Sequence, residues 1–139
     1  VVDLPYPENK KLALKCKKRG INFIQLVSPT TTSARLKRII KDSHDMIYYI
    51  SMLSTTGGKL KVSPKKILKE YKKVKSQNKS KNVVIGFGIT EKTIKSLKNA
   101  DGLVVGSAIC KEITNSIKKR QNAVINVTNV VRKLRNKIK

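Results

Sequence analysis

Short runs of Val, Ile and Leu alternate along this chain with segments in which apolar residues recur every three or four positions. The runs are typical of strands, and the wider spacing is typical of helices with one buried face. The alternation predicts five strands, each followed by a helix, and one additional helix at the end. The predicted strands span residues 1–4, 21–27, 46–50, 83–85 and 103–105.

The helical segments are marked by their apolar faces and by residues that favour helix ends. Gly20 follows residues 9–19, at the position where glycine commonly ends a helix. Ser63 and Pro64 suit the cap and the first residue of a later helix. A further helix is predicted over residues 90–98, and the last one is expected to cover a core. The buried faces are predicted at Leu36, Ile39 and Ile40; Ile67, Leu68, Tyr71 and Val74; Ile94 and Leu97; Ile109, Ile113 and Ile117; and Val124, Val127, Val131, Leu134 and Ile138.

Strands that alternate with helices favour an α/β fold with a parallel sheet and right-handed crossover connections. A (β/α)8 TIM barrel has about 250 residues, or roughly 31 for each βα unit. The 139 residues of this chain therefore accommodate about four and a half units. The pattern leaves two arrangements open: an open sheet, or the last part of a barrel whose first units are absent.

The chain is strongly basic, with 32 Lys and Arg against 8 Asp and Glu and a formal net charge of +24. Of the basic residues 26 are Lys and only 6 are Arg, whose planar side chain is better suited to phosphates and guanine edges. Aromatic residues make up 4%, with no Trp, which leaves few rings for stacking on bases. These features favour a solvated basic surface over the alternative, a basic nucleic-acid-binding module.

The cellular location is constrained by apolar runs and by cysteines. No apolar run approaches the roughly 18 residues of a membrane span, and the first residues show no secretion signal. Cys16 and Cys110 are too few for a disulfide scaffold, so we expect a reducing, cytoplasmic location. Both are interpreted as packing residues on apolar helix faces. One histidine and two distant cysteines do not make a metal-binding cluster.

Turns rich in small residues follow the last three predicted strands. Glycine lets the backbone approach a ligand closely, and the free N–H groups at a helix N-terminus attract phosphate. In barrels the phosphate often lies between the loops after strands seven and eight. If the last two predicted strands are those strands, Gly88, Gly106 and Ser107 converge on one phosphate. The three turns span residues 51–58, 86–90 and 106–108.

Five segments, in this order, resemble the carboxyl-terminal half of the tryptophan synthase alpha chain family. The resemblance extends from residue 1 to about Ile117. It implies that residues 1–139 are the C-terminal part of a single (β/α)8 barrel domain, containing strands four to eight, their helices and a C-terminal helix, with the N-terminal units missing. The segments are Asp-Leu-Pro at 3–5, Leu-Val-Ser-Pro-Thr-Thr at 26–31, Ile-Tyr-Tyr-Ile-Ser at 47–51, Gly-Phe-Gly-Ile at 86–89 and Asp-Gly-Leu-Val-Val-Gly-Ser-Ala at 101–108.

The resemblance also implies a lyase reaction of tryptophan biosynthesis. Alpha chains cleave indole-3-glycerol phosphate by a retro-aldol reaction, which yields indole and glyceraldehyde 3-phosphate. A beta chain that carries pyridoxal phosphate then joins indole to serine, so an alpha2beta2 assembly is expected and no cofactor is expected in this chain. Another phosphate-binding (β/α)8 barrel enzyme is the alternative, but it would leave segments 26–31 and 47–51 unexplained.

Seven residues match functional positions of the family. Tyr48 matches a tyrosine that lines the pocket, Phe87 an aromatic residue beside the indole ring, and Thr56 the threonine of a mobile loop that closes over substrate. One departure lies in that loop, where Ser54 replaces the first glycine of Gly-x-Thr-Gly and would be strained at a positive φ. The phosphate-binding positions are matched by Gly57, Gly88, Gly106 and Ser107.

No catalytic residue is assigned within the chain. The family's catalytic glutamate and aspartate would precede residue 1, so the 139-residue piece alone is expected to be inactive. Asp3 is the only acid expected at the carboxyl end of a strand, and one carboxylate does not make an acid–base pair. The other acids are expected on helices (Glu8, Glu70, Glu91 and Glu112) or near helix ends and strand starts (Asp42, Asp45 and Asp101).

Overall fold

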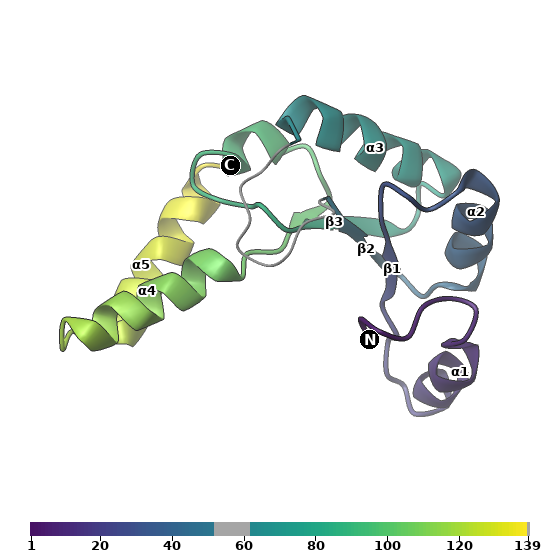
Figure 1. Ribbon diagram of the computed structural model, residues 1–139, viewed down its shortest axis with the longest axis horizontal. Helices are drawn as coiled ribbons and strands as arrows, with labels where there is room; N and C mark the ends of the chain where they lie inside the picture. Colours follow the sequence, from purple (N-terminus) through teal and green to yellow (C-terminus); the bar gives the residue numbers. More distant parts are fainter. Residues whose placement is uncertain (52–61, 139) are drawn as a thin grey trace.

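The structure, a computed structural model, describes residues 1–51 and 62–138. Its centre is a parallel sheet in which each strand pairs with the next one along the chain, in the order β1-β2-β3-β4 (Figure 1). This arrangement confirms the parallel α/β architecture that the alternating pattern predicts. The strands are β1 (Gln25–Val27), β2 (Met46–Ile50), β3 (Asn82–Gly86) and β4 (Gly102–Leu103).

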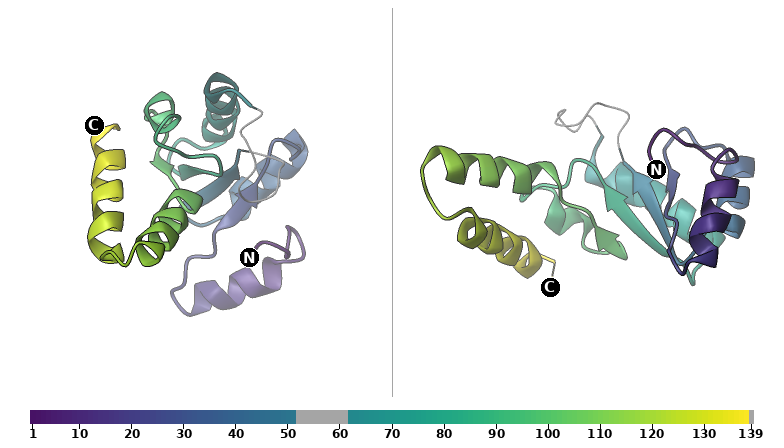
Figure 2. Two further views of the ribbon diagram at one scale, coloured as in Figure 1. Left: turned by 60° about the vertical axis from the view of Figure 1, so that its left-hand side comes forward. Right: turned by 90° about the horizontal axis from the view of Figure 1, so that it is seen from below.

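Helices α2 and α3 and the 3-10 helix η1 cover one face of the sheet, whereas α4 and α5 pack against each other and project from its β4 side (Figures 1 and 2). None of the described helices is long and apolar enough to cross a membrane. The helices are α1 (Lys10–Lys18), α2 (Ser33–Asp42), α3 (Pro64–Gln77), η1 (Ile94–Leu97), α4 (Ser107–Lys118) and α5 (Ala123–Asn136).

The core lies between the sheet and the helices α2 and α3. On β2 the buried residues alternate, so that Ile47 and Tyr49 face the helices and Tyr48 and Ile50 lie half-buried on the other face. The expected opposite orientation of the two tyrosines is thus confirmed. Burial, with Glu70 of α3 nearby, raises the pKa of Tyr49 to about 12. The helix side of the core is formed by Leu36, Ile39, Ile40, Ile67, Tyr71, Val74, Ile94 and Leu97.

Helix α3 begins as its sequence predicts. The hydroxyl of Ser63 accepts a hydrogen bond from the Lys66 amide at 3.4 Å, and Pro64 is the first helical residue, where the missing N–H costs nothing. Gly20 lies just beyond α1 with φ of +70°, a conformation that favours glycine. Both helix ends thus carry the local signals that the sequence shows.

The first predicted strand, residues 1–4, is not formed. Residues 2 and 3 make a turn, and Val1 and Val2 are 62% and 78% exposed. The Leu4 carbonyl accepts a hydrogen bond from the side chain of Asn9 at 3.2 Å, and the same amide group bonds Gln25 of β1 at 2.9 Å. The side chain of Asn9, and not a set of backbone hydrogen bonds between strands, therefore connects residues 1–4 to β1.

The prediction of a helix over residues 90–98 is also wrong, since only the short 3-10 helix η1 forms there. The Thr93 hydroxyl accepts a bond from the Thr90 amide at 3.0 Å and donates one to the Gly88 carbonyl at 2.9 Å. Threonine side chains that bond the backbone in this way compete with helical hydrogen bonds. The expected burial of Ile94 and Leu97 is nevertheless confirmed, at 2% and 0% exposure.

The packing expected for the last helices is only partly found. Leu134 of α5 is buried in the core, whereas Ile117 of α4 and Val124 of α5 are 66% and 75% exposed. Cys110 is exposed and Cys16 is half-buried, so the interpretation of Cys110 as a packing residue is wrong. The cause is the projection of the α4–α5 pair away from the sheet, which leaves the outer faces of both helices uncovered (Figure 2).

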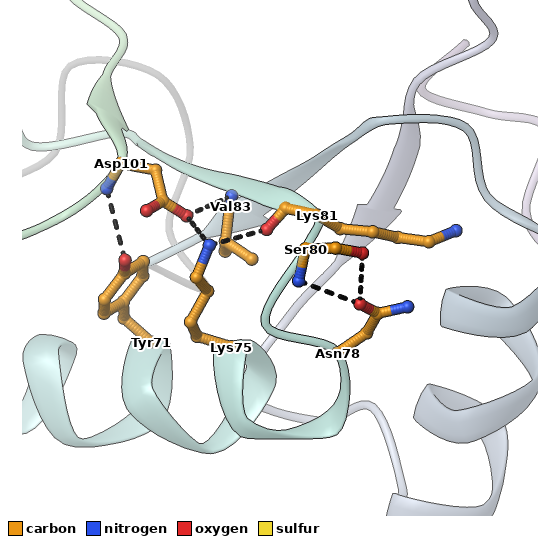
Figure 3. Close-up of polar contacts among 7 residues, drawn as sticks. All are labelled: Tyr71, Lys75, Asn78, Ser80, Lys81, Val83 and Asp101. Carbon is orange, nitrogen blue, oxygen red and sulfur yellow. Dashed lines mark hydrogen bonds and ion pairs between the residues drawn. The ribbon is translucent and has the colours of Figure 1, made fainter.

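Polar side chains join the sheet to α3 at the amino ends of the strands (Figure 3). The Asp101 carboxylate accepts a hydrogen bond from the Val83 amide and pairs with the Lys75 ammonium, both at 2.8 Å, while the Asp101 amide donates to the Tyr71 hydroxyl at 3.2 Å. Burial raises the pKa of Asp101, but the bonds from Lys75 and Val83 outweigh it and hold that pKa below its usual value. One carboxylate thus links α3, β3 and the start of β4.

Lys81, the residue directly before β3, caps the C-terminus of α2. Its ammonium group donates to the carbonyl of Ile40 at 2.7 Å and to the carbonyl and hydroxyl of Ser43 at 2.5 and 2.9 Å. A cation suits the negative end of a helix, where the last carbonyls have no partner within the helix. Burial lowers the pKa of Lys81, against the attraction of Asp45 and Asp42.

Candidate functional site

The carboxyl ends of β2, β3 and β4 lie at one edge of the sheet. Ile50 pairs with Gly86, and Ile85 pairs with Leu103, so the turns that follow the three strands start side by side. The Val104 amide extends the pairing by donating to the Ile85 carbonyl at 2.9 Å. This edge therefore brings together the turns after β3 and β4 that the sequence predicts to act together.

Two aromatic rings form a corner at this edge. Tyr48 of β2 and Phe87, just after β3, lie with their ring centroids 6.5 Å apart and their planes perpendicular. Edge-to-face contact of this kind is a favourable aromatic arrangement. Both residues are half-buried, and burial raises the pKa of the Tyr48 phenol. The corner presents apolar ring surface beside the turn after β3.

The turn after β3 has an unusual backbone. Phe87 and Gly88 have φ of +68° and +66°, in the left-handed region that favours glycine. For Phe87 this conformation costs of order 1–2 kcal/mol and needs support from its surroundings. Ser51, directly after β2 and only 1% exposed, provides that support: its hydroxyl lies 2.8 Å from the Gly86 carbonyl and 2.9 Å from the Phe87 carbonyl.

Ser51 and Thr93 are the two residues of this edge whose roles the sequence pattern does not reveal. The Thr93 hydroxyl donates to the Gly88 carbonyl, the next carbonyl of the same turn, at 2.9 Å. The sequence places Ser51 at the end of the segment 47–51 that resembles the family and at the start of a small-residue turn, with no role of its own. Its one signal is its position, immediately after a buried strand and level with the Gly-x-Gly turn of the next strand.

The second turn leads directly into a helix. Gly106 is the N-cap of α4, with no side-chain cap bond, and Ser107 is the first helical residue; both are exposed. The first N–H groups of a helix have no partner within it, and the positive end of the helix dipole attracts anions. Among the described residues nothing lies within 4 Å of the place where a Cβ on Gly106 would project. An anion can therefore approach this backbone closely.

Three of the predicted site positions, Ser54, Thr56 and Gly57, lie outside the described residues. Tyr48, Phe87 and Gly88 lie together at the ends of β2 and β3, and Gly106 and Ser107 lie at the neighbouring end of β4.

The carboxylates lie elsewhere in the molecule. Asp3 lies in an exposed turn and not at a strand end, so its expected placement is wrong. The expected helical placement of Glu8 and Glu91 is also wrong, since both lie in turns, and Glu91 pairs with Lys137 at 2.9 Å. In residues 1–51 and 62–138, no group of three His, Cys, Asp or Glu side chains could hold a metal. The expected placement of the others is confirmed: Glu70 and Glu112 lie on α3 and α4, and Asp42, Asp45 and Asp101 lie at helix ends or strand starts.

A parallel sheet with helices on one face, a glycine turn after one strand and a helix N-terminus after the next is the arrangement found in part of a (β/α)8 barrel. The sequence profile described as "Tryptophan synthase alpha chain" matches residues 1–139, and the chain belongs to this family. The expected fold class and the resemblance are thereby both confirmed.

The relatives show how much of the family's length is present. A tryptophan synthase alpha chain from Pelagibacter ubique (strain HTCC1062) is 78% identical over 138 residues, which cover 99% of this chain and 52% of that protein. The chain thus spans about half the length of the curated relatives it matches.

Solved structures agree in fold. Tryptophan synthase subunit alpha from Legionella pneumophila str. Paris superposes with a TM-score of 0.85 at 27% identity, covering 99% of this chain and 50% of that one. The tryptophan synthase a2b2 complex from Pyrococcus furiosus contains a chain that superposes with a TM-score of 0.73 at 30% identity, covering 98% and 54%.

Proposed function

We propose that this chain is the carboxyl-terminal half of a tryptophan synthase alpha chain, which as a whole cleaves indole-3-glycerol phosphate to indole and glyceraldehyde 3-phosphate. The observation that carries the proposal is the position of two turns. Phe87–Gly88 after β3 and Gly106–Ser107 before α4 lie at neighbouring strand ends, in a chain that matches the family along its whole length.

The phosphate group of the substrate is assigned to this edge of the sheet. The amides of Gly88, of the N-cap Gly106 and of Ser107, the first residue of α4, supply N–H donors, and the helix dipole supplies a favourable potential. No metal or basic side chain is required for a phosphate held in this way. Gly57 is proposed as a further donor.

The indole ring is assigned to the aromatic corner. The perpendicular rings of Tyr48 and Phe87 offer a flat apolar ligand both a face and an edge. Together with the phosphate site next to it, this corner would hold the substrate at both ends and thereby fix the bond between indole and the glycerol chain. Holding the reacting group in one orientation removes much of the entropic part of the barrier.

The bond-breaking step needs groups that residues 1–139 do not supply. Cleavage transfers a proton to C3 of the indole ring, breaks the bond from C3 to the glycerol chain and removes a proton from the adjacent hydroxyl, which becomes the aldehyde. We assign these two proton transfers to a glutamate and an aspartate in the preceding half of the barrel. Thr56 is proposed to act in a loop that closes over the substrate and excludes water.

The partner is proposed to be a tryptophan synthase beta chain in an alpha2beta2 assembly in the cytoplasm. Support comes from the relative in the Pyrococcus furiosus a2b2 complex. Pyridoxal phosphate would belong to the beta chain, and the alpha chain would need no cofactor of its own.

The test is indole release by the full-length protein. Purified full-length protein with indole-3-glycerol phosphate is expected to yield indole and glyceraldehyde 3-phosphate in equal amounts, and residues 1–139 alone are expected to yield neither. A full-length protein that binds phosphorylated compounds but releases no indole would refute the proposal in favour of another phosphate-binding barrel enzyme.

A further inference from the structure

Ser51 binds the end of the neighbouring strand through both its backbone and its side chain. Its amide donates to the Gly86 carbonyl at 3.2 Å, and its hydroxyl lies within 2.9 Å of the carbonyls of both Gly86 and Phe87. The Phe87 carbonyl is thereby directed toward β2. The two carbonyls share the single proton of this hydroxyl, and Ser51 is only 1% exposed, so little water can compete for it.

This contact also determines where the next amide points. In a trans peptide the C=O and the following N–H point in opposite directions. Because the Phe87 carbonyl is directed toward Ser51 and β2, the Gly88 N–H is directed away from β2. The sheet order places β3 between β2 and β4, so β4 also lies on the side of β3 that faces away from β2.

The N-terminus of α4 lies on that same side. β4 stays against β3 through the bond from Val104 to Ile85, and it continues into Gly106 and Ser107. Among the hydrogen bonds within the described parts of the chain, none is donated by the Gly88 amide. Within the described residues, this amide and the first amides of α4 are therefore available to one anion between the two turns.

We propose that Ser51 is a positioning residue for the phosphate site: its buried hydroxyl holds the Phe87–Gly88 peptide in the orientation that aims the Gly88 N–H at the phosphate. The inference rests on the proposed function, because it presupposes a phosphate at this edge. Without the hydroxyl, the strained left-handed backbone at Phe87 loses its support and the peptide can rotate.

The experiment uses three variants of the full-length protein. Ser51→Ala removes the hydroxyl and leaves the backbone contact, while Ser51→Thr keeps a hydroxyl at the same place. Ser116→Ala is the matched control, because Ser116 is also 1% exposed. Its hydroxyl accepts a hydrogen bond from the Asn126 side chain at 3.0 Å, between α4 and α5 and not in the turns at the strand ends.

The readouts separate phosphate binding from general stability. Dissociation constants are measured for glycerol 3-phosphate and for indole, together with the thermal midpoint and KM and kcat for indole-3-glycerol phosphate. For Ser51→Ala we expect about tenfold weaker binding of glycerol 3-phosphate and a raised KM, the size expected for one misdirected hydrogen bond to a charged group. Indole binding should change less than twofold, and Ser51→Thr should restore most of the loss.

Two results would overturn the inference while the proposed function stands. One is a Ser51→Ala protein that binds glycerol 3-phosphate as well as Ser116→Ala does. The other is equal weakening of indole and glycerol 3-phosphate binding, which would indicate a general disturbance of the site. If the unsubstituted full-length protein neither binds glycerol 3-phosphate nor releases indole, the proposed function itself is wrong and the inference falls with it.

Discussion

The phenol ring of Tyr48 on β2 occupies the space into which a side chain at Gly86 on β3 would project. The two residues are diagonal neighbours, since Tyr48 pairs with Val84 and Gly86 lies two positions further along β3. The glycine is therefore required by a neighbouring side chain and not by its own backbone conformation.

Replacing Gly86 by alanine is expected to destabilise the full-length protein by about 1–3 kcal/mol, the usual cost of forcing an extra group into a packed site. The Tyr48 ring would have to leave its place, and its contact with Phe87 would be lost with it. Urea unfolding measures the loss, and indole release reports the effect on the site.

The double variant tests whether the ring is the cause. In a Tyr48→Ala background the cost of Gly86→Ala should fall by about 1–3 kcal/mol, because the two substitutions act on one contact. Gly106→Ala is the control, since no described atom lies within 4 Å of a Cβ there and Tyr48→Ala should not change its cost. Additive costs of Gly86→Ala and Tyr48→Ala would contradict the contact.

Asp101 is expected to make stability depend on pH. Its pKa is lower in the folded protein than in the unfolded chain, so its stabilisation is present above the unfolded value of about 4 and is lost as pH falls through the folded value. Asp101→Asn should cost about 1–2 kcal/mol near neutral pH, and this cost should shrink in acid.

The measurement is the free energy of unfolding in urea for both proteins across the acid range. Glu91→Gln is the control, because the Glu91 carboxylate pairs with Lys137 at 61% exposure and exposed pairs contribute little. A cost of Asp101→Asn that stays constant down to the lowest pH would show that the charge does not matter.

The architecture could be predicted from the sequence because it depends on local patterns. The alternation at Ile47 and Tyr49 and the Ser63–Pro64 start of α3 need no knowledge of distant residues. The close approach of Tyr48 and Gly86 depends on strand register, which no local pattern encodes.

The features that the sequence does not reveal depend on contacts between distant residues. The segment at residues 1–4 reads as a strand by composition, but its backbone is held by Asn9, a contact that only the folded chain reveals. Likewise Phe87 gives no sign of its left-handed conformation, and Ser51 gives no sign that it supports that conformation.

Residues 1–139 produced alone are expected to aggregate or to depend on the rest of the barrel. Leu26, Tyr48 and Ile50 line a sheet face that the described helices leave half-exposed, and Ile117 and Val124 add exposed apolar surface. Exposed apolar patches and an unpaired strand edge favour association. Size-exclusion chromatography with light scattering, and a thermal melt, should be run near 150 mM salt, about the ionic strength at which the repulsion between basic copies is screened. A soluble monomer that melts cooperatively would contradict this expectation.

The basic surface is expected not to bind nucleic acid specifically. The exposed lysines of α3, among them Lys69, Lys72 and Lys73, should give weak binding of duplex DNA at low salt that vanishes near about 150 mM. Fluorescence anisotropy across a salt series measures this. Replacing the three lysines by Gln should reduce the low-salt binding and leave indole release unchanged. Binding retained near about 150 mM, with a steep salt slope, would favour a nucleic-acid-binding function instead.

The polar links of Asp101 and Lys81 lie at the amino ends of the strands, opposite the turns proposed to hold the substrate. The contacts that hold the helices to the sheet and the turns proposed to bind the substrate thus lie at opposite ends of the same strands. Substitutions that alter ligand preference at the turns can accumulate without loosening the ties between sheet and helices. A scaffold divided in this way can evolve new specificities while it keeps its stability.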